Sequence, residues 1–135
     1  MENIEQFLST LPLFKSFNPT ELKQLIEKSQ LRTFAPGEKI IRFSHPGQFL
    51  GIIIHGRAEA VVTEKAGERR RIGLLNQGDF MGEMSLLTGE PTVADVIALE
   101  ECRIMLVPQE VFSTVLVIKP DAVRLMAKAI TERLK

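Results

Sequence analysis

The glycine residues of this chain are confined to its middle, and that distribution most constrains its fold. All nine glycines lie between Gly37 and Gly89, whereas the first 36 residues and the last 46 have none. Glycine weakens helices and suits the tight turns between short strands. The sequence therefore predicts helices at both ends and a strand-rich centre.

Two helical patterns occupy the N-terminal end. Apolar residues recur at helical spacing over residues 4–11 and predict an amphipathic helix that ends at Pro12. A second helix is predicted to start at the Asn-Pro-Thr-Glu stretch of residues 18–21. Asn18 can cap this helix, and Glu21 can reach back to the cap amide.

The centre reads as short strands separated by glycine turns. Strand-like runs cover residues 39–43, 49–55, 57–64, 68–75, 96–100 and 102–107. Short strands at such regular spacing are typical of a sandwich or a rolled-up β-barrel.

Helical patterns return after Pro108. Residues 110–118 predict a short helix, and Pro120 opens a last one. We expect the apolar face of that last helix to consist of Val123, Met126, Ala127, Ile130 and Leu134.

Size and charge indicate one ordinary globular domain. The 135 residues support a single core, and 17 basic and 17 acidic side chains cancel. The N-terminus is not a secretory signal and no apolar run could span a membrane, so we expect no membrane association. One cysteine allows no internal disulfide. We expect a cytoplasmic protein that does not bind nucleic acid directly.

The candidate site is the stretch Gly78–Asp95, which reads GDFMGEMSLLTGEPTVAD. Gly82 lets a ligand approach the main chain, and residues 84–87 are predicted to form one helical turn whose first amides can receive a polar ligand. Glu83 can accept hydrogen bonds from a ribose diol. The alternative is a glycine-rich turn with a surface glutamate.

This stretch resembles the phosphate-binding cassette of the cyclic nucleotide-binding domain family, in which Phe-Gly-Glu, a variable residue, Ser or Ala, and Leu are followed by Pro-Arg-Ser/Thr-Ala. The residues that match are Phe80, Gly82, Glu83, Ser85, Leu86, Leu87, Gly89, Glu90, Pro91 and Ala94, with Met81 inserted. The resemblance extends from about Leu11 to Leu134. One departure is Ser44, where the family usually has glycine.

The resemblance implies a mainly β fold, a jelly-roll-like β-barrel flanked by N-terminal and C-terminal α-helices. It implies one domain over residues 1–135, with helices in 1–30, the β-roll in 31–107 and C-terminal helices in 109–135. Such a domain is a regulatory sensor and not an enzyme. Its last helix covers the nucleotide, pairs with a second subunit in a homodimer, or packs on its own barrel.

Two positions of the cassette differ from the family pattern. Thr92 stands where an arginine clamps the cyclic phosphate, and Val93 stands where Ser or Thr is usual. Between Arg71 and Arg103 the chain has no Lys, Arg or His. A charge-assisted hydrogen bond contributes about 1.5–3 kcal/mol, and about 1.4 kcal/mol is a factor of ten in affinity. Cyclic nucleotide affinity should therefore fall by roughly one to three orders of magnitude.

The ligand expected is weakly bound cyclic AMP or cyclic GMP, or a nucleoside that carries no phosphate. The residues predicted to bind it are Gly82, Glu83, Met84, Ser85, Thr92 and Val93. We also expect a protein effector as partner. Two alternatives remain open: an interaction or scaffold domain without a ligand, and the sensor half of a transcription regulator that binds cyclic AMP conventionally.

Other chemistry finds little support. His45, His55 and Cys102 are far apart in sequence, so we predict no metal site and no cofactor. No motif for nucleotide hydrolysis or a catalytic triad is present. The basic run Arg69–Arg71 is interpreted as a solvated face.

Overall fold

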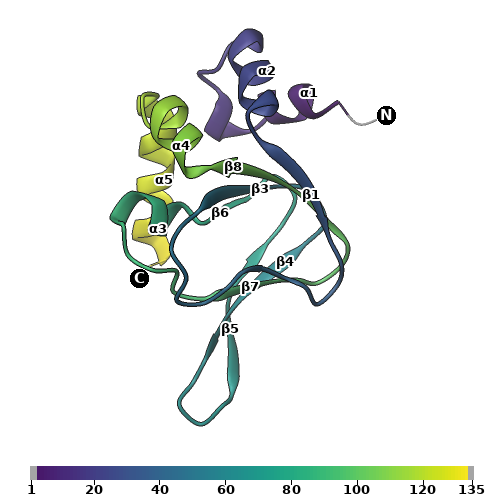
Figure 1. Ribbon diagram of the computed structural model, residues 1–135, viewed down its shortest axis with the longest axis vertical. Helices are drawn as coiled ribbons and strands as arrows, with labels where there is room; N and C mark the ends of the chain where they lie inside the picture. The colour runs from purple at the N-terminus through teal and green to yellow at the C-terminus, as the bar shows by residue number, and fades with distance from the viewer. Residues whose placement is uncertain (1–2, 134–135) are drawn as a thin grey trace.

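The computed structural model describes residues 3–133, in which eight strands form two four-stranded antiparallel sheets (Figure 1). One sheet has the strand order β1-β8-β3-β6 and the other β2-β7-β4-β5. The strands are β1 Gln30–Phe34, β2 Lys39–Ile41, β3 Phe49–His55, β4 Ala58–Thr63, β5 Arg69–Leu75, β6 Phe80–Met81, β7 Asp95–Ala98 and β8 Cys102–Pro108. The predicted jelly-roll-like fold is confirmed, although the two sheets are not hydrogen-bonded into a closed barrel.

Helices lie before and after the strands, as the glycine distribution predicts, and one short helix, Glu83–Thr88, lies between β6 and β7 (Figure 1). They are α1 Ile4–Ser9, η1 Pro12–Phe14, α2 Pro19–Glu27, α3 Glu83–Thr88, α4 Gln109–Val111, the π-helical turn η2 Phe112–Leu116 and α5 Pro120–Arg133. The predicted capping box of α2 is present. Asn18 Oδ1 accepts from the Glu21 amide at 2.8 Å, and Glu21 Oε1 accepts from the Asn18 amide at 2.9 Å.

Strand β3 is buried on both faces, which accounts for its almost continuous apolar sequence. Leu50, Ile52 and Ile54 pack with the N-terminal and C-terminal helices, whereas Ile53 belongs to the core between the sheets. Successive side chains of a strand point to opposite faces, so one strand serves both cores. Its neighbour β8 alternates in the same way.

The buried face of the last helix matches its predicted apolar face only in part: Met126 is buried and Val123 and Ile130 are partly buried, as expected, but Ala127 is not. Ala122, which the predicted face does not include, is buried as well. The reason is where α5 packs: it lies against η1 and α3. Leu134, which the predicted face includes, lies outside the described residues.

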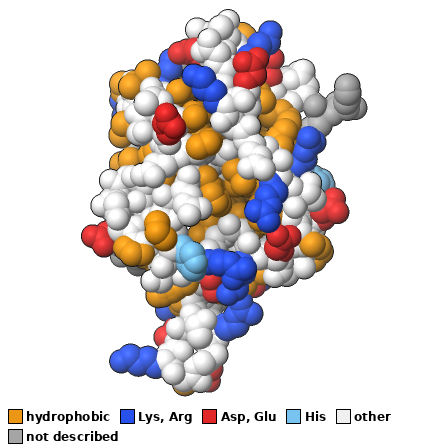
Figure 2. All heavy atoms as spheres, in the orientation of Figure 1, with side chains coloured by type: hydrophobic (Ala, Val, Ile, Leu, Met, Phe, Trp, Pro, Cys, Tyr) orange, Lys and Arg blue, Asp and Glu red, His pale blue; other side chains and the backbone are white. Residues whose placement is uncertain are grey.

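The β4–β5 hairpin projects from the body and is charged (Figures 1 and 2). Arg70 pairs with Glu64 and Arg71 with Glu59, each at 2.7 Å between nitrogen and oxygen, and all four side chains are at least partly exposed. The basic run is therefore a solvated face, as predicted. Figure 2 shows hydrophobic side chains gathered in the middle of the same face. No helix within residues 3–133 is both long enough and apolar enough to span a bilayer.

Candidate ligand-binding site

The cassette enters its helix through a residue that has to be glycine. Gly82 precedes α3 with φ at 88°, in the left-handed region. A Cβ atom at this position would lie 2.7 Å from the carbonyl oxygen of Phe49. The next residue, Glu83, is completely buried. The close contact with β3 therefore fixes where the cassette sits on the β-roll.

A cavity of about 430 Å³ lies against the cassette and brings most of the predicted site together. Of the six predicted ligand-binding residues, five line it: Gly82, Met84, Ser85, Thr92 and Val93. Glu83 is not among the lining residues, because its side chain is buried in the protein. The roles of all six in binding stay predictions.

The far wall of the cavity comes from strands that the sequence analysis did not assign to the site. These lining residues are Ile41, Ala60, Ile72, Gly73, Leu74, Leu75 and Val96, and Met81, Pro91 and Ala94 of the Gly78–Asp95 stretch complete the lining. Strand β4 contributes Ala60 and β5 the consecutive residues 72–75, so strand alternation alone would not have identified this part of the lining.

No lining residue, all of which belong to the described part of the chain, carries a positive charge. The polar side chains of the lining are the hydroxyls of Ser85 and Thr92. Among the lining side chains, a bound anion would therefore meet apolar groups and two hydroxyls in place of a guanidinium.

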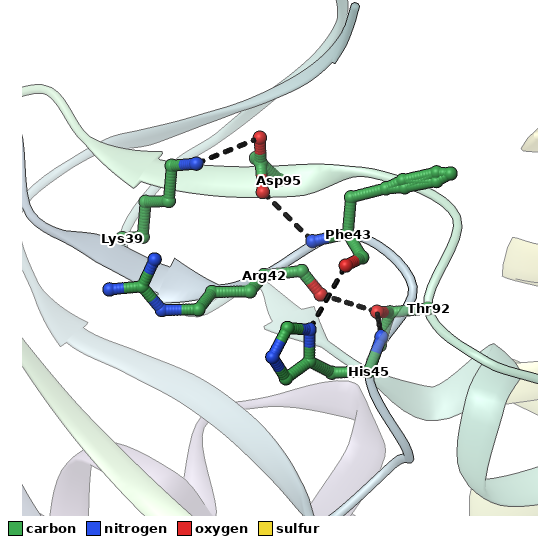
Figure 3. Close-up of polar contacts among 6 residues, drawn as sticks. All are labelled: Lys39, Arg42, Phe43, His45, Thr92 and Asp95. Carbon is green, nitrogen blue, oxygen red and sulfur yellow. Dashed lines mark hydrogen bonds and ion pairs between the residues drawn. The ribbon is translucent and has the colours of Figure 1, made fainter.

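The Thr92 hydroxyl is engaged by the loop between β2 and β3, residues 42–48 (Figure 3). The O–H group donates to the carbonyl oxygen of Arg42, and Oγ1 accepts from the His45 amide at 3.0 Å. On the main chain, the Thr92 amide donates to the His45 carbonyl at 2.9 Å, and the Ser44 amide donates to the Thr92 carbonyl at 2.8 Å. We call these four contacts the Thr92 clasp.

Asp95 holds the same loop three residues further on (Figure 3). Oδ1 accepts from the Phe43 amide at 2.8 Å, and Oδ2 lies 3.3 Å from Lys39 Nζ. Burial acts to raise the pKa of Asp95, but the Phe43 hydrogen bond, the Lys39 ammonium and the charge of Arg69 together lower it. Asp95 is thus a charged anchor behind the cassette.

The β2–β3 loop lies close to the cassette, and one of its residues has an unfavourable backbone conformation. Ser44 has φ at 61°, the sole positive value among the non-glycine residues of the described chain. Gly47 lies so near the cassette that a Cβ there would be 2.6 Å from Ser85 Oγ. The departure from the family's glycine at position 44 therefore falls where glycine would be unstrained.

The soft metal ligands singled out from the sequence are not assembled. Cys102 is buried, its Sγ donates to the Arg57 carbonyl at 3.1 Å, and burial raises the pKa of its thiol. Within residues 3–133, no three His, Cys, Asp or Glu side chains are grouped to hold a metal ion.

Comparison with known proteins identifies the family. The family described as "Cyclic nucleotide-binding domain" matches residues 31–118, which is more than half of the chain. A cAMP-dependent protein kinase regulatory subunit from Mycosarcoma maydis is 35% identical over 94 residues, which is 70% of this chain and 18% of the relative. The chain therefore spans about a fifth of that protein's length.

Solved structures agree in fold. The regulatory domain of Toxoplasma gondii PKA with cAMP has a TM-score of 0.84 at 22% identity, over 95% of this chain and 48% of that one. The regulatory subunit of a cAMP-independent protein kinase A from Trypanosoma cruzi, bound to guanosine, has a TM-score of 0.75 at 28% identity, over 96% and 49%.

A third structure is a mutant of the corresponding subunit from Trypanosoma brucei, bound to cAMP in its A site. It has a TM-score of 0.76 at 27% identity, over 92% of this chain and 49% of that one. Its three substitutions are glutamate to alanine, threonine to arginine and, at the next position, valine to alanine. The sequence match and the shared fold together show that the chain belongs to the cyclic nucleotide-binding domain family.

Proposed function

We propose that this chain is a regulatory sensor module whose cavity takes an uncharged nucleoside in preference to a cyclic nucleotide. The observation that carries the proposal is the cation-free lining of the cavity, with Thr92 where the family has its phosphate-binding arginine. Loss of a guanidinium–phosphate contact lowers the affinity for cyclic nucleotides and leaves the affinity for a neutral ligand unchanged.

Two of the relatives support this choice of ligand. The Trypanosoma cruzi subunit belongs to a cAMP-independent protein kinase A and holds guanosine. The Trypanosoma brucei mutant that holds cAMP has gained an arginine from the threonine of an adjacent Thr-Val pair. This chain carries the same pair at Thr92-Val93.

The output of the sensor is proposed to run through α5 to a protein effector. Helix α3 begins directly after Gly82 and packs against α5. A ligand that draws the cassette toward itself would shift α3 and with it α5, provided that it binds one arrangement better than the other. The regulatory subunits among the relatives support an effector of this kind. Self-association through α5 is the other arrangement we propose.

Calorimetric titration with guanosine, adenosine, cyclic AMP and cyclic GMP tests the ligand. We expect at least one nucleoside to bind at least tenfold more tightly than either cyclic nucleotide. Sub-micromolar cyclic AMP binding would favour the conventional sensor, and no heat from any of the four would favour the scaffold alternative.

The variant Glu83→Ala separates the sensor from the scaffold. The sequence-based prediction is that Glu83 accepts from the ribose diol, so in a sensor, loss of the carboxylate should weaken binding of the nucleoside, although Glu83 does not line the cavity in this structure. In a scaffold, binding of the partner protein would be unchanged. Thermal melts of both proteins control for folding, since Glu83 is buried.

A further inference from the structure

The two hydroxyls that line the cavity, those of Ser85 and Thr92, already donate hydrogen bonds within the protein. Ser85 Oγ lies 2.5 Å from the carbonyl oxygen of Glu90, and Thr92 Oγ1 contacts the carbonyl oxygen of Arg42. A carbonyl oxygen can only accept a hydrogen bond, so each hydroxyl has to be the donor. The direction of both hydrogen bonds is therefore fixed by chemistry.

What these oxygens can still offer a ligand is lone pairs. Thr92 Oγ1 also accepts from the His45 amide at 3.0 Å, which leaves it one further acceptor position. Ser85, which is buried, is likewise restricted to accepting. A phosphate oxygen is itself an acceptor, and two acceptors facing each other form no hydrogen bond.

A nucleoside and a cyclic nucleotide differ in whether their ribose 3′ and 5′ oxygens can donate a hydrogen bond to such acceptors. In a 3′,5′-cyclic nucleotide the 3′ and 5′ oxygens of the ribose are both esterified to the phosphate and carry no proton. In a nucleoside both are hydroxyls and can donate. Since Thr92 stands where the family arginine meets the cyclic phosphate, the ligand's 5′ oxygen is the group that it would face.

We infer that Thr92 and Ser85 form an acceptor pair that selects ligands with a neutral hydrogen-bond donor at the 5′ position, with Thr92 the principal acceptor. This inference rests on the proposed function and specifies its ligand class: nucleosides with a free 5′-hydroxyl. An esterified or methylated 5′ oxygen would be disfavoured even without a charge. The ligand is selected by whether its 5′ oxygen carries a proton that it can donate, and this effect is separate from the loss of the arginine.

The test is a titration of the full chain with guanosine, 5′-deoxyguanosine and 5′-O-methylguanosine. We expect both analogues to bind about three- to tenfold more weakly than guanosine, the range of one neutral hydrogen bond. If guanosine and 5′-deoxyguanosine bind equally, the inference is overturned and the proposed function stands. If neither guanosine nor adenosine binds, the proposed function itself fails.

Variants at Thr92 distinguish an acceptor from a loop anchor. Thr92→Val keeps the shape and removes the oxygen, so it should weaken guanosine binding and bring the ratio of the guanosine to the 5′-deoxyguanosine affinity most of the way to one, the remainder being due to Ser85. Thr92→Ser should keep the wild-type ratio, and it also serves if the valine variant does not fold. If Thr92→Val weakens both ligands by the same factor, Thr92 acts only through the loop and the inference is wrong. Ser85→Ala should reduce the ratio by less than Thr92→Val.

Discussion

Lys119 Nζ lies 2.6 Å from Glu21 Oε2 and so ties the residue just before α5 to the first turn of α2. The same ammonium lies 5.0 Å from the ring centre of Phe17 and 3.4 Å from the carbonyl oxygen of Ser16. A movement of α5 about this point has either to break these contacts or to carry the N-terminal helices with it. The pair therefore couples the proposed output helix to the other end of the chain.

Lys119→Met should loosen this coupling while keeping the apolar stem of the side chain. The hydrogen bond from Lys119, followed by that from the Asn18 amide, lowers the pKa of Glu21. A lowered carboxyl pKa stabilises the fold above the unfolded-state value of about 4.3, and that contribution is lost as the pH falls through the folded-state pKa. We expect a lower melting temperature at pH 7 and a smaller further decrease below about pH 4 than in the wild type.

A matched control is Arg124→Met, which removes the ion pair with Asp121. Both of those side chains are more than half exposed, so the loss should be small. Thermal melts from pH 7 to pH 3 compare the two variants. Equal melting temperatures would contradict a special role for Lys119.

Thr92→Arg should raise cyclic AMP affinity by about tenfold or more, because a charge-assisted contact to phosphate returns. It should also lower the free energy of unfolding by about 1–3 kcal/mol, because the side-chain half of the Thr92 clasp is lost. Titration calorimetry and urea unfolding measure the two effects. Thr88→Arg adds the same charge at the exposed C-terminal end of α3, outside the cavity lining. A gain of similar size in that control would mean non-specific attraction.

Asp95→Ala should destabilise the fold by about 1–3 kcal/mol at pH 7, since the Phe43 amide loses its acceptor. Asp95→Asn keeps an acceptor oxygen and loses the Lys39 ion pair, so we expect a smaller effect. The lowered pKa of Asp95 means that its contribution is present above the unfolded-state pKa of about 3.9 and disappears as the pH falls below it. The wild-type and alanine unfolding curves should therefore converge in acid, and a constant difference down to pH 2 would contradict this.

Gly82→Ala and Gly67→Ala separate backbone strain from steric contact. Both glycines have similar left-handed φ values, 88° and 86°, but a Cβ at Gly67 would meet nothing within 4 Å. We expect Gly67→Ala to cost about 1 kcal/mol and Gly82→Ala about 2–3 kcal/mol or more, because its Cβ would press on the Phe49 carbonyl. Equal costs in urea unfolding would show that the contact relaxes freely.

Local signals predicted most of the helices and six of the eight described strands, but neither β1 nor β6, and non-local contacts explain other features that were missed. The capping box at Asn18 and Glu21 could be read from four residues, because both of its hydrogen bonds are made within them. The Thr92 clasp joins residues 47 and 50 positions apart, and no spacing in the sequence reports it. The buried face of α5 depends on η1 and α3, so its own apolar pattern misassigned Ala127.

The Thr92 clasp also bears on how ligand preference changes during descent. A lineage that replaces Thr92 by arginine leaves the Arg42 carbonyl and the His45 amide to find other partners at the same step. On the proposed function, a return to cyclic nucleotide recognition would therefore pass through a less stable intermediate, which a compensating change in residues 42–48 would stabilise. Because replacing Thr92 costs stability and keeping it does not, the clasp would favour retention of the threonine once it is present.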